Sequence, residues 1–127
     1  MDTKIKDFRD LIVWKESHKL VLSIYQITRK FPREEIFGLV SQMRRCAVSI
    51  TSNVAEGFGR RGYKEKIQFF YISQGSIIEL KNQIEICKDV HYIKEDIYDD
   101  LIKQSNLSHK LLQGLITKTK TFLNHKS

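Results

Sequence analysis

The sequence predicts an all-α fold, an up-down-up-down four-helix bundle, from three observations. Apolar residues recur at alternating spacings of three and four in four long segments, which is the period of an amphipathic helix. One proline and six glycines in 127 residues are too few breakers for a many-stranded sheet. The connections are short, so antiparallel packing is the economical arrangement. We expect a single domain over residues 1–127, with helices at about 10–30, 34–57, 64–90 and 95–123.

The first two helices follow from their apolar stripes and from the residues at their ends. The stripe of the first helix includes Leu11, Trp14, His18, Val21 and Tyr25. Pro32 ends this helix, because the residue before a proline is pushed out of helical geometry. The stripe of the second helix consists of Ile36, Leu39, Val40, Met43, Cys46, Ala47, Ile50 and Val54. Glu34 and Glu35 suit its first turn, and the glycine-rich GFGRRG segment ends it.

The third helix has two apolar seams, whereas the ends of the fourth are marked by charge. The first seam consists of Ile67, Phe70, Ile77, Leu80, Ile84 and Cys87, and the second of Phe69, Ile72, Ile86 and Val90. A helix with two apolar faces is expected to contact more than one neighbour. The fourth helix opens with Glu95 and Asp96 and closes with Lys118 and Lys120, an order that suits the helix dipole.

Composition limits the class of function. The net charge of +7 favours a polyanionic partner, so RNA or DNA is the candidate ligand. The N-terminal MDTKIKDFRD lacks the apolar run of a signal peptide, and no stretch approaches the roughly 18 apolar residues of a transmembrane helix. Cys46 and Cys87 lie far apart within apolar helical patterns, which favours buried free thiols. We therefore expect a cytoplasmic protein with no membrane partner.

Sequence motifs of catalysis and metal binding do not occur. The four histidines form no Glu-x-x-His pair, and the chain contains no His-Glu-x-x-His, P-loop or Cys-x-x-Cys motif. Gly57 and Gly59 form a Gly-x-Gly pair, but no strand precedes them and the third glycine of a dinucleotide-binding motif is missing. We expect no enzymatic activity, no catalytic residue, no metal and no cofactor.

A polar stripe runs beside the apolar stripe of the second helix. Its members recur at spacings of three and four, and they are Gln42, Arg45, Ser49, Asn53 and Glu56. The third helix carries a matching set, Ser76, Glu79 and Gln83. Three interpretations remain open. The stripe is a solvated face, a polar network or subunit contact in which Arg45 pairs with Glu79 or Glu56, or a catalytic centre of Ser49, His18 and one of these glutamates. The many small polar and amide groups favour the network, because buried charges need partners.

Basic residues form clusters that suit phosphate. The main candidates bracket the polar stripe, and they are Arg44, Arg45, Arg60, Arg61 and Lys64. A secondary cluster at the first turn consists of Arg29, Lys30 and Arg33. A loop that leads into a helix N-terminus is a natural phosphate site. Because successive turns of an up-down bundle lie at opposite ends, Arg60 and Arg29 are expected to be far apart. No recognition helix or RNA-binding signature indicates sequence-specific readout.

Several blocks in order resemble a known family. They are VWKESHKL, FPREEIFGLVSQMRR, SITSNVAEG and GSIIEL, within about residues 8–92. The chain resembles the small four-helix-bundle proteins encoded in intervening sequences of bacterial 23S rRNA genes. It is also similar to the accessory variability protein of diversity-generating retroelements. The resemblance implies a homopentameric ring without enzymatic activity. In the retroelement relatives, the basic ring associates with a reverse transcriptase and with nucleic acid.

Two functions stand as expectations. The leading one is a non-enzymatic, basic, oligomeric bundle that binds nucleic acid through backbone charge, with the two arginine clusters as its site. The alternative is a protein-interaction adaptor that docks onto an enzyme such as a reverse transcriptase, without strong nucleic-acid binding of its own. If the bundle is a ring protomer, the polar stripe is a contact within or between protomers.

Overall fold

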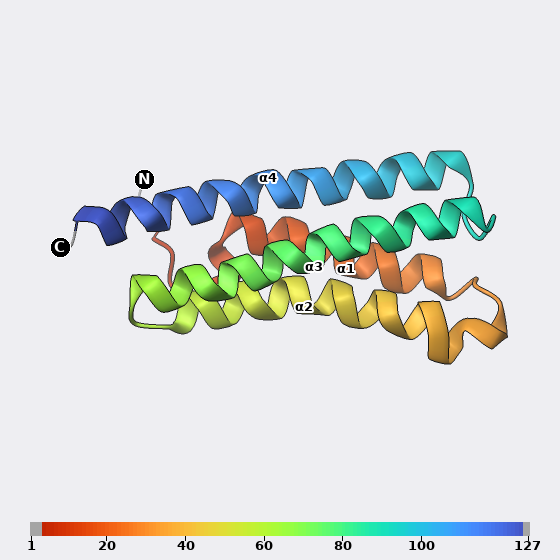
Figure 1. The fold of residues 1–127 in the computed structure, drawn as a ribbon, viewed down its shortest axis with the longest axis horizontal. Coiled ribbons are helices and arrows are strands. Elements are labelled where there is room, and N and C mark those ends of the chain that lie inside the picture. Colours follow the sequence, from red (N-terminus) through yellow and green to blue (C-terminus); the bar gives the residue numbers. More distant parts are fainter. Residues whose placement is uncertain (1–3, 126–127) are drawn as a thin grey trace.

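The computed structural model describes residues 4–125 and confirms an all-α four-helix bundle. The four α-helices are α1 (Ile12–Thr28), α2 (Ser41–Gly59), α3 (Tyr63–Asp89) and α4 (Glu95–His125). They run antiparallel in sequence order, so that the α1–α2 and α3–α4 connections share one end and the α2–α3 connection lies at the other (Figure 1). The described residues contain no strand.

Each α-helix packs on two others, in the cyclic order α1, α2, α3, α4. The core between them is formed by fully buried side chains from all four helices, among them Leu20, Ile24, Met43, Ile50, Phe70, Ile77, Leu80, Leu101 and Leu112. Burial of each such side chain stabilises the fold by about 1.5–3 kcal/mol. At Gly57 α2 packs tightly on α3, since an added Cβ would lie 2.6 Å from Cε1 of Phe70.

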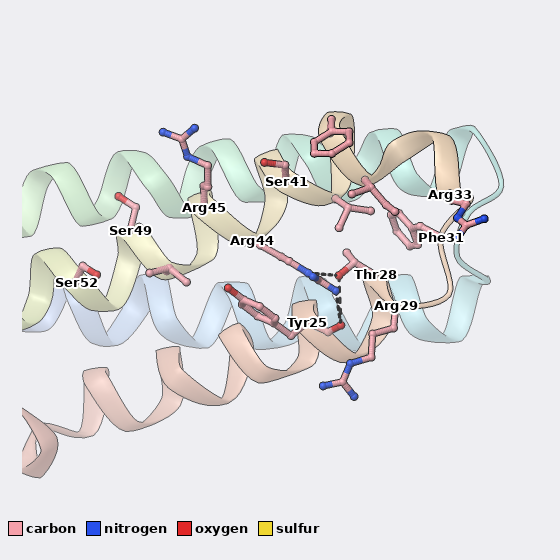
Figure 2. A pocket seen from close by; sticks show the side chains of 14 residues that line it. Tyr25, Thr28, Arg29, Phe31, Arg33, Ser41, Arg44, Arg45, Ser49 and Ser52 are labelled. Carbon is pink, nitrogen blue, oxygen red and sulfur yellow. Dashed lines mark hydrogen bonds between the residues drawn. The ribbon is translucent and has the colours of Figure 1, made fainter.

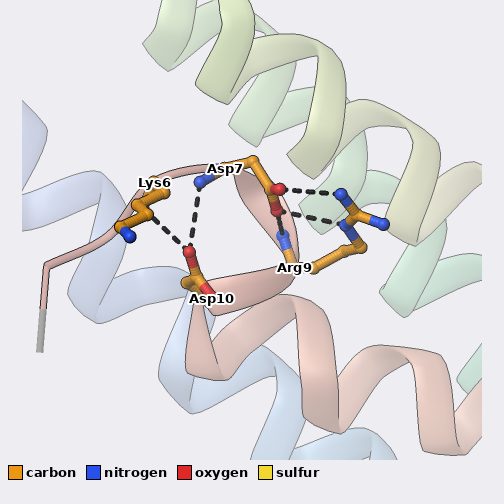
Figure 3. A network of polar contacts seen from close by, with 4 residues as sticks. All are labelled: Lys6, Asp7, Arg9 and Asp10. Atoms are coloured by element: carbon orange, nitrogen blue, oxygen red, sulfur yellow. Dashed lines mark hydrogen bonds and ion pairs between the residues drawn. The ribbon is translucent and has the colours of Figure 1, made fainter.

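The chain enters the bundle through a short 3-10 helix, η1 (Phe8–Asp10), where the sequence predicted the start of the first α-helix. The Asp7 carboxylate accepts a hydrogen bond from the Arg9 backbone N–H at 2.8 Å, and Asp10 accepts one from the Lys6 N–H at 2.8 Å (Figure 3). The hydrogen bond from the Arg9 side chain lowers the pKa of Asp7. Leu11 is then extended, and α1 begins at Ile12.

The second expected helix is broken near its start. The segment begins as a 3-10 helix, η2 (Arg33–Glu35), and continues as a π-helical turn, η3 (Ile36–Val40), before α2. Gly38 in η3 has φ −110° and ψ −113°, outside helical geometry. The Glu35 carboxylate accepts hydrogen bonds from the Leu39 N–H at 3.2 Å and from the Tyr92 hydroxyl at 2.7 Å. The kink is therefore held in part by a residue of the α3–α4 connection at the same end of the bundle.

The α3–α4 turn closes the same end of the molecule. His91 has φ 65°, and the Tyr92 N–H bonds to the Cys87 carbonyl at 2.9 Å while the His91 N–H bonds to that of Lys88 at 3.0 Å. This is the hydrogen-bond pattern of a Schellman helix end. The Tyr92 ring lies 5.1 Å from the Phe31 ring, centroid to centroid. The turn thus fastens α3 and α4 to the α1–η2 connection.

Two expectations about side-chain packing are confirmed. Cys46 and Cys87 are buried free thiols, and burial raises the pKa of both to about 12. The helix α3 contacts more than one neighbour, since it packs on α2 and α4, although Ile72, Ile86 and Val90 of its second apolar seam are exposed. None of the helices in residues 4–125 has both the length and the apolar character to cross a membrane.

Candidate nucleic-acid interface

A groove of about 1040 Å³ lies at the end of the bundle where α1 leads into α2. Four arginines line it, Arg29, Arg33, Arg44 and Arg45 (Figure 2). Hydroxyl groups of Ser41, Ser49 and Ser52 line the α2 side. We call this surface the arginine groove. It combines two residues of the secondary cluster with two of the main cluster, which the sequence analysis had kept apart.

The arginine groove carries positive charge without an acidic counterpart. None of its 14 lining residues, all within the described part of the chain, is Asp or Glu. Among residues 4–125, the ion pairs involve none of these four arginines. Guanidinium groups form bidentate hydrogen bonds with phosphate, and serine hydroxyls are ordinary partners of phosphate oxygens. The lining therefore suits a phosphate-bearing ligand.

Arg44 spans the groove from α2 to α1. Its Nε donates to Thr28 Oγ1 at 3.0 Å and one terminal nitrogen donates to the Tyr25 carbonyl at 3.3 Å. Its guanidinium carbon lies 4.7 Å from the centroid of the Tyr25 ring. All of these partners are neutral, so Arg44 is fixed in place while its charge remains uncompensated.

The other three arginines are exposed around the groove. Figure 2 shows the guanidinium groups of Arg29, Arg33 and Arg45 pointing in different directions around the central Arg44. A single small anion would not touch all four of them. An extended polyanion that crosses the groove would meet several in succession. The arrangement therefore favours a polymer over a phosphorylated metabolite.

The Arg60–Lys64 cluster lies at the opposite end, at the α2–α3 connection (Figure 1). Arg60 pairs with Glu56 at 3.1 Å, and its guanidinium carbon lies 4.7 Å from the Phe69 ring centroid. Lys66 donates to the Phe58 carbonyl at 2.6 Å near the end of α2, and burial lowers its pKa. Arg61 and Lys64 are exposed. Two of the positive side chains at this end, Arg60 and Lys66, are therefore engaged by partners within the chain.

Lys30 is the one member of the secondary cluster that does not line the arginine groove. It lines a different groove, between α1 and α4, together with Asp96 and Asp100. Lys94 lines this groove as well, so the two carboxylates balance the two lysine charges there. The structure therefore separates Lys30 from Arg29 and Arg33, although the three are close in sequence.

The polar stripe and its matching set on α3 form one hydrogen bond between the two helices, and others within each helix. Ser76 Oγ donates to Ser49 Oγ at 2.9 Å, and Asn53 Nδ2 donates to the same oxygen at 3.0 Å. Gln83 Nε2 donates to Glu79 Oε2 at 3.3 Å. Gln42, at the start of the stripe, is exposed. Part of the stripe is therefore a hydrogen-bonded network within the chain.

The pairing of Arg45 with Glu79 or Glu56 that the network interpretation suggested is not formed within the described chain, and a contact of this kind between chains stays a prediction. Within residues 4–125 Arg45 forms no ion pair, and Glu56 pairs with Arg60 instead. Glu56 lies four residues before Arg60, which puts the two on one helix face, whereas eleven residues separate it from Arg45. At 1.5 Å per residue, that separation is about 16 Å along α2.

The catalytic interpretation of the stripe gains no geometric support. The Ser49 hydroxyl is engaged by Ser76 and Asn53, while the His18 ring stacks on Trp14 with centroids 4.6 Å apart. No hydrogen bond joins Ser49 to His18 in the described part of the chain. In that same part, no three His, Cys, Asp or Glu side chains are grouped as a metal site would require.

Sequence reasoning found the arginines but missed the aromatic part of the groove. Phe37 and Tyr25 line it with the arginines. Phe37 was counted in no apolar stripe, and it directly precedes Gly38. A large apolar residue outside the stripe and next to a glycine was the available signal that the chain turns outward there.

Comparisons with known proteins agree with this fold. The family model of the 23S rRNA-intervening sequence protein matches residues 9–114, which include the whole arginine groove. A crystal structure of a protein of unknown function, from the S23 ribosomal protein family of Bacteroides thetaiotaomicron VPI-5482, superposes with a TM-score of 0.78. The two are 21% identical, over 84% of this chain and 96% of the other. A search of curated proteins finds no significant match.

Proposed function

The chain belongs to the 23S rRNA-intervening sequence protein family, and from this premise we propose that it is a non-enzymatic, oligomeric bundle that binds nucleic acid through the phosphate backbone. The observation that carries the proposal is the arginine groove, where four arginines meet without an acidic residue in the lining. The family name refers to ribosomal RNA, which makes RNA the first ligand to test. A cytoplasmic location is part of the proposal, because ribosomal RNA is the first candidate ligand.

Backbone charge is the proposed mode of recognition. The exposed guanidinium groups of Arg29, Arg33 and Arg45 have long side chains that follow a flexible ligand, and Arg44 supplies a fixed positive charge beneath them. Contacts of this kind position a nucleic acid but carry no sequence information. The expected binding is therefore tight at low salt, weak at high salt and similar across sequences.

Assembly into a homopentameric ring is part of the proposal. Several exposed apolar side chains, Ile72, Ile78 and Ile86 on α3 and Val90 just after it, lack a covering surface within the chain. Exposed apolar side chains of this kind are available for a contact with another chain. Five protomers of net charge +7 would together carry about +35 and repeat the arginine groove around the ring. Light-scattering mass of the purified protein tests this step directly.

Replacing the three exposed groove arginines tests the binding function. The triple variant Arg29→Ala, Arg33→Ala, Arg45→Ala should lower affinity for a labelled strand of about 20 nucleotides by about 100-fold at low salt. The slope of log affinity against log salt concentration should become shallower by about 2, because each of three lost phosphate contacts contributes about 0.7. The measurement is fluorescence anisotropy at about 50 and about 200 mM salt.

The matched control removes the same charge from α4. Lys103, Lys110 and Lys118 are exposed and lie outside the arginine groove, so their replacement by Ala keeps the net charge equal to that of the groove variant. The control should retain most of the affinity. Equal losses in both variants would show that only net charge matters. No binding by the wild-type protein at low salt would refute the proposed function.

A second function, docking onto an enzyme such as a reverse transcriptase, is favoured by one observation. The exposed apolar seam of α3 suits a protein partner as well as a second copy of the chain. The likeness to the accessory variability protein of diversity-generating retroelements belongs with this candidate. An oligomer that ignores nucleic acid, and that binds a partner enzyme through Ile72 and Ile86, would favour docking over the primary proposal.

A further inference from the structure

Phe37 stands apart from the other exposed apolar side chains. It is 96% exposed, whereas the other exposed large apolar residues of the described chain lie between 36% and 63%. Half-exposed apolar side chains are ordinary on a protein surface. A phenyl ring with almost no contact to its own chain is unusual, because burying an aromatic ring is among the larger single contributions to folding. The ring therefore needs an explanation outside the packing of the bundle.

The backbone holds Phe37 outside the core by a defined structure. The residue lies in η3, immediately before the non-helical Gly38. Both carboxylate oxygens of Glu35 are engaged in fixing this turn, one by the Leu39 N–H and the other by the Tyr92 hydroxyl. A Cβ on residue 38 would lie 2.9 Å from Glu35 Oε1, so glycine suits this position. The exposure of Phe37 is thus built into the fold.

Phe37 is also the open aromatic face of the arginine groove. Three aromatic residues line the groove, Tyr25, Phe31 and Phe37. Phe31 is buried, and the guanidinium of Arg44 covers the ring of Tyr25. Phe37 is left for a ligand, in the same groove as the exposed Arg33 and Arg45. An open ring among cations is the combination that holds unpaired strands, because bases stack on the ring while phosphates meet the cations.

We propose that the arginine groove takes a single-stranded segment of nucleic acid, with one base stacked on Phe37 and neighbouring phosphates on Arg29, Arg33 and Arg45. This inference rests on the proposed function and specifies the form of nucleic acid. A duplex keeps its bases stacked on each other and offers the groove only its phosphates. The groove therefore binds an unpaired strand more tightly than charge contacts alone would allow.

Three probes of about 20 nucleotides separate stacking from charge. They are an unpaired strand, the corresponding duplex, and an abasic strand that keeps the sugar-phosphate backbone without bases. The full-length protein should bind the unpaired strand about 10-fold more tightly than the abasic strand in fluorescence anisotropy. A strand that carries 2-aminopurine should lose fluorescence on binding, because stacking quenches that base.

Phe37→Ala should abolish the difference between the unpaired and abasic strands. Affinity for the abasic strand and the duplex, and the salt slope for all probes, should not change. The variant should fold, because the ring is almost fully exposed. Leu107→Ala on α4 is the matched control, an exposed apolar side chain outside the groove, and it should leave all three affinities unchanged.

Two results would overturn base stacking while the proposed function stands. Phe37→Ala could weaken all three probes equally, or it could leave the unpaired strand unaffected, and in either case binding of the abasic strand would still report phosphate contacts. A lower light-scattering mass for Phe37→Ala would place the ring between protomers and would also overturn the proposal. If the wild-type protein bound none of the probes, the proposed function would fail together with this inference. Running RNA and DNA versions of the strand identifies the sugar, since a 2′-hydroxyl contact favours RNA.

Discussion

Helix α2 has an arginine pair near each end, and the structure treats the two pairs differently. At its start, Arg44 bonds only neutral partners and Arg45 is exposed without an ion pair in the described chain. After its end, Arg60 pairs with Glu56 and stacks on Phe69. Two similar dipeptides in the sequence thus become an uncompensated charge in a groove and a partly neutralised one in a loop.

The two arginine pairs differ because of the residues about one helical turn, or four positions, away from them. The residues four positions before and after Arg44 are Val40 and Val48, and those around Arg45 are Ser41 and Ser49. None of them can neutralise a guanidinium. Glu56, in contrast, is four residues before Arg60, where side chains on a helix meet. Counting positive charges in a segment is therefore a weaker guide to a phosphate site than asking which of them lack an acid at this spacing.

Charge reversal should give the largest effect, and it tests directly whether the two ends of α2 differ in nucleic-acid binding. Arg29→Glu with Arg45→Glu should lower affinity for an unpaired strand by about 100-fold or more at low salt, because it replaces attraction by repulsion inside the groove. Arg61→Glu with Lys64→Glu makes the same change of charge at exposed positions of the loop end. We expect less than about a 10-fold loss there. Anisotropy titrations of both variants decide the question, and equal losses would give the two ends equal roles.

A steric change at the loop end tests that region without altering charge. Gly57→Ala would place a Cβ 2.6 Å from Phe70 Cε1 and 3.0 Å from Phe69 Cβ. Because Phe70 is buried and cannot move freely, we expect a loss of about 1–3 kcal/mol in the free energy of unfolding. Gly114→Ala is the control, with open space at its Cβ, and should gain up to about 1 kcal/mol. Urea unfolding measures both.

The nucleic-acid affinity of Gly57→Ala tests whether the α2–α3 connection takes part in binding. Gly57 lies at the end of the bundle opposite to the arginine groove. If the groove is the binding site, folded Gly57→Ala protein should bind an unpaired strand as the wild type does. A marked loss of affinity would mean that the α2–α3 connection takes part in binding.

Hydrophobic period and breaker positions were sufficient to predict the four-helix bundle. The arginine groove was not predictable in the same way. Arg29 and Arg44 are brought together by the antiparallel return of α2, which the sequence implied. The kink at Gly38 that exposes Phe37 depends on Tyr92, 57 residues from its partner Glu35. A hydrogen bond over that separation leaves no periodic pattern, so the helix was expected to run unbroken.

The turn at the groove end offers a smaller, stabilising change. His91 has a left-handed φ of 65°, which costs a residue with a Cβ about 1 kcal/mol relative to glycine. His91→Gly should therefore raise the free energy of unfolding by up to about 1 kcal/mol while the Schellman hydrogen bonds persist. Thermal and urea unfolding test this. Binding should not change, because His91 does not line the arginine groove.

The smallest expected effect concerns the pH dependence of the kink. The Tyr92 hydroxyl and then the Leu39 N–H lower the pKa of Glu35 from its ordinary value of 4.5. A depressed carboxyl pKa stabilises the fold above the unfolded value, and this stabilisation is lost as the pH falls through the folded one. Tyr92→Phe removes the larger cause, so it should destabilise the protein slightly at neutral pH. The difference from wild type should shrink below about pH 4.5.

Urea unfolding across this pH range checks the prediction, with Tyr71→Phe as the control for the loss of an exposed tyrosine hydroxyl. If Tyr92→Phe and wild type had the same stability at every pH, Tyr92 would act through its ring contact with Phe31 alone, because phenylalanine keeps the ring. In that case the Tyr92 hydroxyl would not hold the kink. Phe37→Ala should then be tested again in the Tyr92→Phe background, because the exposure of the ring would depend on Gly38 and on the hydrogen bond from the Leu39 N–H to Glu35.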